Sequence, residues 1–384
     1  MKFEFATANR IIYGAGTSQQ IVEDAQGFGK RPLLVTGKNS NRAQFAVNKL
    51  KANGFTVTQF AIADEPSTGI VLEGVTLARA ETCDFVIGIG GGSVIDGAKA
   101  IAALLTNEGE PLDYLEVVGK GLPLQNAPAP YIAIPTTAGT GAEVTRNAVL
   151  AVPEHRVKAS LRSALMLPDL AIVDPELTYS MPPSITAVTG LDALTQLIEP
   201  YVSHLANPLT DALCREGIQR AGRSLRRAYE NGSDHDARND MALASLMGGL
   251  ALANAKLGAV HGFAGPLGGM FFAPHGAVCA RLLPYAMETN VKALQSRQPK
   301  NPALQRYTEI AHILTGDPAA TAQDGVHWIQ ALCADLHIPG LSTYGLTTKD
   351  IPMVINKSKN ASSMKGNPIS LSEIELAHIL EQSL

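Results

Sequence analysis

Short apolar runs alternate with longer amphipathic segments through the first half of the chain. Segments with helical character, such as Asn41 to Asn53 and Gly69 to Thr82, separate some of these runs. Strands that are apolar on both faces must be covered on both sides, so the pattern predicts a parallel sheet between helices. The candidate strands are Pro32 to Thr36, Thr56 to Ile62, Asp84 to Ile89, Tyr131 to Ile134 and Leu170 to Val173.

The pattern changes after Pro182 and Pro183. Beyond them β-branched runs nearly vanish, and stretches rich in Ala, Leu and Met, such as Asp240 to Lys256, have the period of a helix. Ser184 is the expected N-cap of the first of these helices. We therefore predict two domains, an α/β domain over residues 1–180 and an all-helical domain over residues 181–384.

Composition narrows the class of protein. The chain has 384 residues, 46% apolar and 17% charged, which is typical of a soluble globular protein with more than one core. A net charge of −4 without a long basic run argues against nucleic acid as a partner. No apolar run is long enough to span a membrane, and the strand-like start, Met1 to Gly14, lacks the layout of a signal peptide. We expect a cytoplasmic protein.

The four cysteines, Cys83, Cys214, Cys279 and Cys333, are widely spaced and form no CxxC pair. This spacing indicates neither a disulfide framework nor a thiolate zinc site, so we interpret them as free, mostly structural thiols. Cys279 alone lies near a segment that carries histidines.

A glycine-rich segment, Gly88 to Gly97 (GIGGGSVIDG), ends a candidate strand and opens a helix. Bare glycines let backbone amides approach a phosphate, and the helix N-terminus adds free N–H groups and the positive end of its dipole. The segment matches neither the GxGxxG fingerprint nor a Walker A loop. It indicates a phosphate site, and a tight turn without a ligand is the alternative.

A second loop, Ile134 to Thr145 (IPTTAGTGAEVT), also follows a candidate strand and is rich in hydroxyls and glycines. The carboxyl ends of parallel strands share one edge of a sheet, so this loop is expected beside the glycine-rich segment. It can then donate hydrogen bonds to phosphate or ribose oxygens. The alternative is an ordinary turn.

Candidate chemistry in the second half lies in two segments. Val260 to Ala280 contains His261, His275 and the run Met270-Phe271-Phe272, which we expect to be buried, partly in a pocket wall. Upstream, Asp192 and Gln196 are four residues apart and share one face of an apolar helix. A buried aspartate needs a cation or strong donors, and one carboxylate with two imidazoles suits Fe²⁺ or Zn²⁺. The alternative is an aspartate hydrogen-bonded to one histidine without metal.

With these segments in place, the chain resembles the iron-containing (group III) alcohol dehydrogenase family, whose relatives include glycerol dehydrogenase, maleylacetate reductase and, more distantly, dehydroquinate synthase. The resemblance covers essentially the whole chain. It implies a Rossmann-like dinucleotide-binding domain, a helical domain and a cleft between them for nicotinamide, metal and substrate. The matching segments are GGGSVIDGAK, IPTTAGTGAEVT, LPDLAIVDPELT, GLDALTQLIEPYVS and HGFAGPLGGMFFAPHGA.

The resemblance also implies roles for particular residues. The family's metal ligands fall on Asp192, Gln196, His261 and His275, and the catalytic group is Asp192, His261 and His275. Gly91, Gly92 and Ser93 would cradle the pyrophosphate, Thr136, Thr137 and Thr140 would line the cofactor, and Asn147 and Lys158 would lie near its ribose and nicotinamide end. Further cofactor-binding candidates are Gly37, Asn39 and Asp96.

Three positions depart from the family pattern. The family usually has histidine where this chain has Gln196, so metal affinity should fall, and the site could even work without metal. A further histidine, four residues after His261 in relatives, is Gly265 here, so a proton-relay or substrate-contacting group is missing. The region Val35 to Arg42 lacks the aspartate of NAD-preferring relatives and carries two cations, so it tolerates NADP or prefers it.

The implied reaction is reversible hydride transfer between NAD or NADP and a small alcohol or aldehyde, with a divalent metal as Lewis acid. Relatives are commonly dimers or larger, so a homo-oligomer is expected. Three alternatives stay open: a metal-independent oxo-acid reductase of the maleylacetate type, a lyase of the dehydroquinate synthase type, and a non-catalytic nucleotide-binding protein.

Overall fold

The computed structural model describes residues 2–384, which divide into two compact units. The sheet unit comprises Thr7–Thr137 and Gly141–Ser180. The helical unit comprises Met181–Leu384, the short segment Ala138–Thr140 and the residues up to Ala6. Each unit has its own buried apolar core.

The sheet unit is built on six parallel strands in the spatial order β1-β8-β5-β4-β2-β3. The five predicted strands are all present and differ from their predicted limits by one or two residues at most. Of the strand-like start, Met1 lies outside the described residues, and within residues 2–14 only Arg10–Tyr13 forms a strand, β1. The bounds are Arg10–Tyr13 (β1), Pro32–Gly37 (β2), Thr58–Ile62 (β3), Phe85–Gly90 (β4), Tyr131–Pro135 (β5) and Leu170–Val173 (β8).

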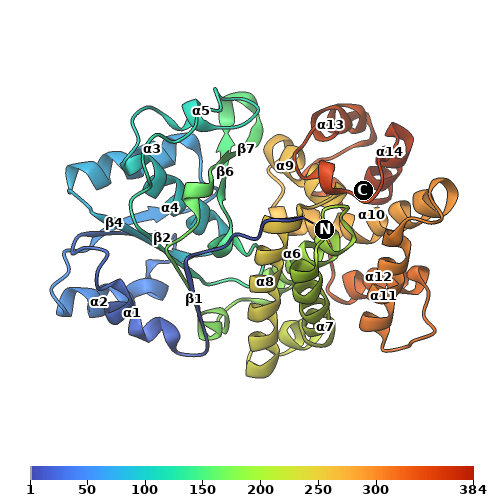
Figure 1. Cartoon of the computed structure of the whole chain (residues 1–384), viewed down its shortest axis with the longest axis horizontal. Coiled ribbons are helices and arrows are strands. Elements are labelled where there is room, and N and C mark those ends of the chain that lie inside the picture. Colours follow the sequence, from blue (N-terminus) through green and yellow to red (C-terminus); the bar gives the residue numbers. More distant parts are fainter. Residues whose placement is uncertain (1) are drawn as a thin grey trace. The chain divides into compact units, whose positions relative to one another are not determined.

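Helices cover both faces of this sheet, as its doubly apolar strands require. Leu33 and Val35 of β2 face a core shared with α3 and α4, whereas Leu34 between them faces a core shared with α1 and α2. The two helical layers lie on opposite sides of the sheet in Figure 1. The helix bounds are Ile21–Ala25 (α1), Gln44–Ala52 (α2), Thr68–Ala80 (α3), Gly92–Leu105 (α4) and Pro111–Tyr114 (α5).

A two-stranded antiparallel sheet was not predicted. It consists of β6 (Asn147–Val152) and β7 (Val157–Arg162), and the inward side of β6 packs against α4. Burial alternates along β6, which gives the period of a strand with one buried face. The hairpin therefore extends the apolar cover of the main sheet without joining it.

The strand order of the main sheet creates a topological switch point between β2 and β4. The chain leaves β2 toward β3 on one side, and it leaves β4 toward β5 on the other side. Open α/β sheets bind ligands outside the carboxyl ends of two such strands. The glycine-rich segment follows β4 directly, so it lies at this point.

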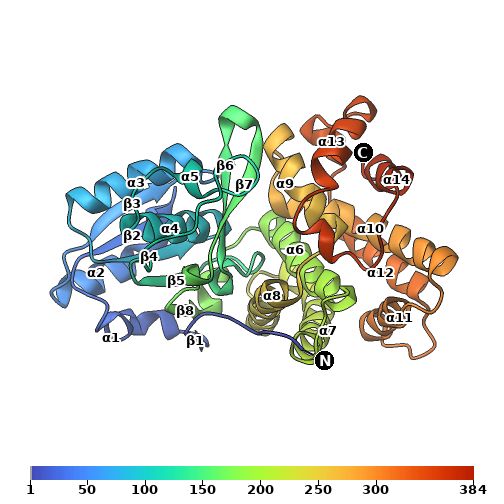
Figure 2. The ribbon, with the colours of Figure 1, turned by 45° about the horizontal axis from the view of Figure 1, so that its top comes forward.

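The helical unit is all helical over residues 181–384, as predicted, with short 3₁₀ turns between some helices. Figure 2 shows its helices, labelled α6 to α14. Their bounds are Pro183–Val202 (α6), Pro208–Glu230 (α7), His235–Ala255 (α8), Ala259–Phe271 (α9), His275–Arg297 (α10), Pro302–Thr315 (α11), Ala322–Asp335 (α12), Ile351–Ser358 (α13) and Glu373–Gln382 (α14).

Two local expectations for this unit were wrong. Helix α6 begins at Pro183 and its N-cap is Pro182, not Ser184, because proline's fixed φ suits the first turn of a helix. The run Met270-Phe271-Phe272 is not buried throughout. Met270 is buried, Phe271 packs partly against the core, and Phe272 is 84% exposed, since it adopts left-handed φ where α9 ends.

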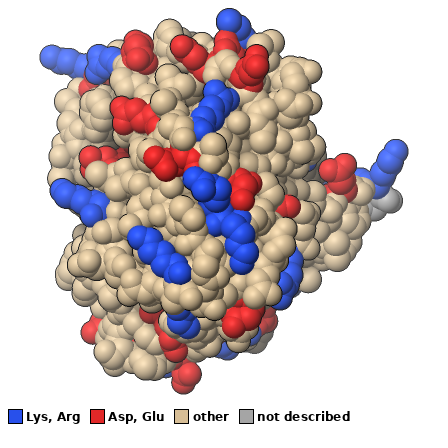
Figure 3. All heavy atoms as spheres, turned by 90° about the vertical axis from the view of Figure 1, so that its left-hand side faces the viewer, with Lys and Arg blue, Asp and Glu red and all other residues tan. Residues whose placement is uncertain are grey.

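Within residues 2–384, no single helix has the length and hydropathy of a membrane span, and α8 and α9 meet those criteria only as a pair bent by 99°. All four cysteines are free, and Cys214, Cys279 and Cys333 are buried. On the face of the sheet unit seen in Figure 3, Lys and Arg side chains are interspersed with Asp and Glu.

Candidate functional site

The glycine-rich segment and the hydroxyl-rich loop meet at the carboxyl edge of the sheet. Gly91 is the N-cap of α4, and Thr136 N donates to Gly90 O at 2.9 Å, which ties the two loops together. A Cβ at Gly91 would lie 3.3 Å from Thr137 Cγ2. Gly37, at the end of β2, lies close to the first turn of α4, since its Cβ would be 3.7 Å from Val94.

This edge has the chemistry of a phosphate site. The first N–H groups of a helix have no intrahelical acceptor, and in α4 these belong to Gly92 and Ser93. Both residues are partly exposed, and glycine at position 92 leaves its amide uncovered. The structure thus brings together six of the predicted cofactor residues at the switch point: Gly37, Gly91, Gly92, Ser93, Thr136 and Thr137.

The other predicted cofactor residues occupy different surroundings. Asn147 begins β6, whereas Lys158 lies four rungs away on β7 and pairs with Glu65 at 2.9 Å. Asp96 Oδ2 accepts from Val149 N of β6 at 3.0 Å, and burial raises the pKa of Asp96 to about 6.

Two further candidates also lie outside this group. Asn39 accepts a hydrogen bond from Asn41 N and so caps a short 3₁₀ turn, and Thr140 belongs to the segment counted with the helical unit. The cofactor role stays a prediction for these five residues as it does for the six at the switch point.

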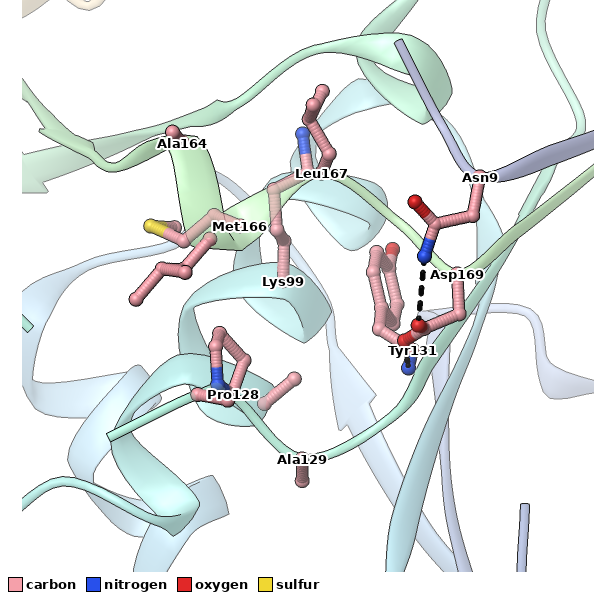
Figure 4. Close-up of a pocket in the computed structure, with 12 residues that line it drawn as sticks. Asn9, Lys99, Pro128, Ala129, Tyr131, Ala164, Met166, Leu167 and Asp169 are labelled. Carbon is pink, nitrogen blue, oxygen red and sulfur yellow. Dashed lines mark hydrogen bonds between the residues drawn. The ribbon is translucent and has the colours of Figure 1, made fainter.

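A cavity of about 270 Å³ in the sheet unit lies away from these loops. Figure 4 shows its wall, which includes Tyr131 and Asp169 at the amino ends of β5 and β8. Asp169 is engaged there, since it accepts from Asn9 Nδ2 and Tyr131 N. The cavity is therefore at the opposite edge of the sheet from the glycine-rich segment.

In the helical unit, three helices converge on one group of side chains. Asp192 comes from α6, His261 from the first turn of α9, and His275 from the first residue of α10. Asp192 Oδ1 lies 3.3 Å from His261 Nε2 and 3.7 Å from His275 Nε2. Asp192 and His261 are buried, whereas the side chain of His275 is 36% exposed. The sequence placed these residues in separate segments, and packing unites them.

Gln196 is buried one turn after Asp192 on α6, as the four-residue spacing predicted. Its side chain packs against α8, where a Cβ at Gly248 would lie 3.2 Å from Gln196 Cβ. Among residues 2–384, neither Gln196 Oε1 nor Asp192 Oδ1 receives a hydrogen bond. Two buried acceptor oxygens without donors are costly unless something else compensates them.

Glu199, which the sequence argument left without a role, orients His261. Glu199 Oε2 lies 2.6 Å from His261 Nδ1, and Glu199 Oε1 accepts from Val260 N at 2.7 Å. Asn367 Oδ1 accepts from Ala259 N, so two side chains satisfy the first amides of α9. With its Nδ1–H donated to Glu199, His261 presents Nε2 toward Asp192. The spacing Asp192, Gln196, Glu199 on one helix face was the available signal.

The fourth member of the group is Cys279, one turn after His275 on α10. Its Sγ lies 3.7 Å from His261 Nε2 and 3.6 Å from His275 Nε2. The candidate ligand atoms of Asp192, His261, His275 and Cys279 all lie within 4.8 Å of one another.

The charges of this group depend on one another. Burial alone would raise the pKa of Asp192, but His275 and His261 hold it below its ordinary value. Burial alone would lower the pKa of His261, but the acidic groups around it, Cys279, Glu199 and Asp192, raise it well above the ordinary value. Burial raises the pKa of Cys279 to about 12.

These residues fit a divalent cation. Ligand atoms about 2.0–2.3 Å from a tetrahedral ion lie roughly 3.3–3.7 Å apart, which is the spacing found between Asp192 and the two imidazoles. The cation would also compensate Asp192 Oδ1 and Gln196 Oε1, which lack donors. The hydrogen bond from His261 to Glu199 is the outer-sphere contact that metal-binding histidines usually make.

Two family models match the chain. The model "Iron-containing alcohol dehydrogenase" matches residues 8–175, and the model "Fe-containing alcohol dehydrogenase family, C-terminal" matches residues 186–384.

Individual proteins are similar over nearly the whole chain. "Alcohol dehydrogenase 4" of Schizosaccharomyces pombe is 38% identical, covering 97% of this chain and 87% of its own length. The crystal structure of a 1,3-propanediol oxidoreductase superposes with a TM-score of 0.92 at 33% identity, with both chains covered completely. Sulfoacetaldehyde reductase of Bifidobacterium kashiwanohense, solved in complex with NAD⁺, gives a TM-score of 0.86 at 28% identity, covering 100% of this chain and 99% of its own.

Proposed function

This chain belongs to the iron-containing alcohol dehydrogenase family, and on that premise we propose how its residues divide the work of alcohol oxidation and carbonyl reduction. It is an oxidoreductase that acts on CH–OH groups and exchanges a hydride with NAD(H). In one direction a small alcohol and NAD⁺ give an aldehyde, NADH and a proton.

The cofactor is proposed to bind at the switch point of the sheet unit. The amides of Gly92 and Ser93 at the N-terminus of α4 face the pyrophosphate, and the hydroxyls of Thr136 and Thr137 donate to cofactor oxygens. What supports this assignment is the meeting of both loops at Gly91, where an added Cβ would lie 3.3 Å from Thr137 Cγ2 and so crowd the approach to the helix amides.

The substrate oxygen is proposed to bind beside the group formed by Asp192, His261 and His275. These three residues hold a divalent metal, Fe²⁺ or Zn²⁺, with Gln196 as a weak additional donor. When bound, such a metal acts as a Lewis acid that lowers the pKa of the alcohol and polarises the aldehyde carbonyl. Asp192 supplies buried negative charge, Glu199 fixes the ring of His261, and His275 joins the group to solvent.

The single observation that carries this proposal is the convergence of candidate ligand atoms from Asp192, His261, His275 and Cys279 within 4.8 Å of one another. Asp192 Oδ1 lies 3.3 Å and 3.7 Å from the two imidazole nitrogens, and a buried carboxylate between two imidazoles is compensated by a shared cation.

Finer features belong to the same proposal. The exposed residues Lys38 and Arg42 follow β2, and no carboxylate lies between Val35 and Arg42, so the chain accepts NADP as well as NAD. We also place the enzyme in the cytoplasm as a homo-oligomer, a dimer or larger, by its resemblance to the family.

The testing experiment is metal analysis of the purified protein, coupled to oxidation of NADH and of NADPH over a panel of small aldehydes. Activity should fall to background after chelation and return when Fe²⁺ or Zn²⁺ is added. Full activity in chelated protein with an oxo-acid substrate would replace this proposal with a metal-independent reductase. Light scattering of the eluted protein gives the oligomeric state.

A further inference from the structure

At position 196 this chain lacks a strong metal ligand. The family pattern has an imidazole there, whereas an amide oxygen is a weak ligand for Fe²⁺ or Zn²⁺. Gln196 is 2% exposed and its Oε1 has no donor within residues 2–384. The group built on Asp192, His261 and His275 therefore has three strong donors and space beside them.

Cys279 lies in that space. It is fully buried, and because it follows His275 by one helical turn, both side chains lie on the same face of α10. Its Sγ is 3.6 Å from His275 Nε2 and 3.7 Å from His261 Nε2. A nitrogen about 2.05 Å and a sulfur about 2.3 Å from one tetrahedral ion are roughly 3.6 Å apart. The sulfur thus has the spacing of a ligand to both imidazoles.

We propose that Cys279 binds the metal as a thiolate, together with Asp192, His261 and His275. The inference rests on the proposed metal site and deepens it. The thiolate from α10 restores the fourth strong donor that Gln196 on α6 does not supply. A softer donor set of this kind shifts the preference of the site from Fe²⁺ toward Zn²⁺.

Burial alone does not explain the position of Cys279. Cys214 and Cys333 are buried in the same unit, yet Cys333 Sγ donates to Ala280 O and Cys214 lies in the apolar core. The rival account is that the Cys279 thiol makes weak hydrogen bonds with the two imidazoles and never meets a metal. A spectroscopic test separates the two accounts.

Cobalt is a suitable probe because a thiolate bound to Co²⁺ adds a near-ultraviolet charge-transfer band to the visible d–d bands. The full-length protein is stripped with a chelator and reconstituted with Co²⁺. Three proteins are compared: wild type, Cys279→Ala, and the matched control Cys214→Ala, which removes the same sulfur from the same core. Circular dichroism and melting curves verify that each variant is folded.

We expect the charge-transfer band in wild type and in Cys214→Ala, and its loss in Cys279→Ala. Zinc affinity should fall by about 100-fold or more in Cys279→Ala, because loss of a direct ligand exceeds the effect of outer-sphere changes. Visible d–d bands without the charge-transfer band in wild type would overturn the role of Cys279 and leave the proposed metal site intact. Failure of wild type to bind cobalt would overturn both.

A second measurement does not depend on the variant's folding. X-ray absorption of the wild-type zinc protein should show one sulfur neighbour at about 2.3 Å, and its absence would contradict the proposal. In addition, Gln196→His introduced into Cys279→Ala should recover at least tenfold in zinc affinity, since an imidazole at 196 replaces the missing donor. No recovery would mean that Cys279 does not substitute for that ligand.

Discussion

The two units build their candidate sites from different materials. In the sheet unit the site consists of backbone amides and hydroxyls at the ends of adjacent strands, and glycine matters because it leaves room. In the helical unit the site consists of charged and soft side chains from α6, α9 and α10, set in an apolar core. In our proposal the first site binds the cofactor through backbone amides and hydroxyls that reach the surface, whereas the second gathers a buried carboxylate and two imidazoles that would hold a cation.

This contrast has a practical consequence. Substitutions in the sheet unit should weaken cofactor binding and leave metal content unchanged. Substitutions in the helical unit should do the reverse. A single substitution that changes both cofactor affinity and metal content would show that the two sites are not independent.

The largest effect is expected from Asp192→Asn. The substitution keeps the shape but removes the buried negative charge that lies 3.3 Å from His261 Nε2. Turnover should fall at least about 1,000-fold, because metal-assisted charge stabilisation is worth several kcal/mol, and metal content should fall with it. NADH binding, followed by fluorescence, should stay within about twofold, given a substitution confined to the other unit. The control Asp211→Asn removes a carboxylate held by Arg306 in the same unit and should retain metal. Normal metal content in Asp192→Asn would contradict the assignment of Asp192 as a metal ligand.

Glu199→Gln should have the next largest effect. Glu199 accepts from both Val260 N and the His261 ring, and a glutamine has only one acceptor oxygen, so one donor loses its partner. Metal affinity should fall about 10–100-fold, as for other outer-sphere partners, measured by competition with a chelator. Glu288→Gln, at a surface ion pair with Lys292, is the control. An unchanged affinity would show that His261 is oriented without Glu199.

Gly91→Val tests the sheet unit. The new side chain would press on Thr137, whose Cγ2 is 3.3 Å from a Cβ at this position, and would cover the helix amides. The Kd for NADH should rise about tenfold, which corresponds to about 1.4 kcal/mol, with metal content unchanged. Gly69→Val, at an exposed position where a Cβ meets nothing closer than 3.9 Å, is the matched control. Equal NADH affinities of Gly91→Val and Gly69→Val would contradict the proposal that the pyrophosphate binds at Gly91.

The last prediction concerns the stability of the fold rather than binding, and it is a pH dependence in the core of the sheet unit. Burial raises the pKa of Glu143 from its ordinary value of 4.5 to about 7, and burial lowers the pKa of Lys99 beside it to about 8. A carboxyl whose pKa is higher in the folded than in the unfolded state destabilises the fold as pH rises from the lower to the higher value. Between pH 5 and 8 the wild type should therefore lose about 2 kcal/mol relative to Glu143→Gln.

Melting temperatures measure this difference. The advantage of Glu143→Gln over wild type should grow by about 2–3 °C from pH 5 to pH 8, whereas the exposed Glu154→Gln should show no such growth. A constant difference across this pH range would mean that Glu143 titrates normally. Metal content should not respond in either variant.

Much of the fold could be predicted from the sequence because it depends on local periodicity. Apolar strands such as Leu170–Val173 were found at their observed limits, and the spacing of Asp192 and Gln196 correctly placed both on one buried helix face. The hairpin of β6 and β7 was missed because its alternating pattern is short and no strong turn signal marks the connection between the two strands. Phe272 was misplaced, because the end of α9 turns its side chain outward.

The sequence by itself determined which residues are available: a glycine-rich turn after an apolar strand, one aspartate on a helix, and two histidines far downstream. Only the tertiary structure decided that α6, α9 and α10 bring His261 and His275 within 3.7 Å of Asp192, and that Cys279 and Glu199 join them. The physical reason is the range of the forces involved. Periodicity and turn chemistry act over a few residues, whereas the position of a side chain across three helices is set by close packing of the whole core.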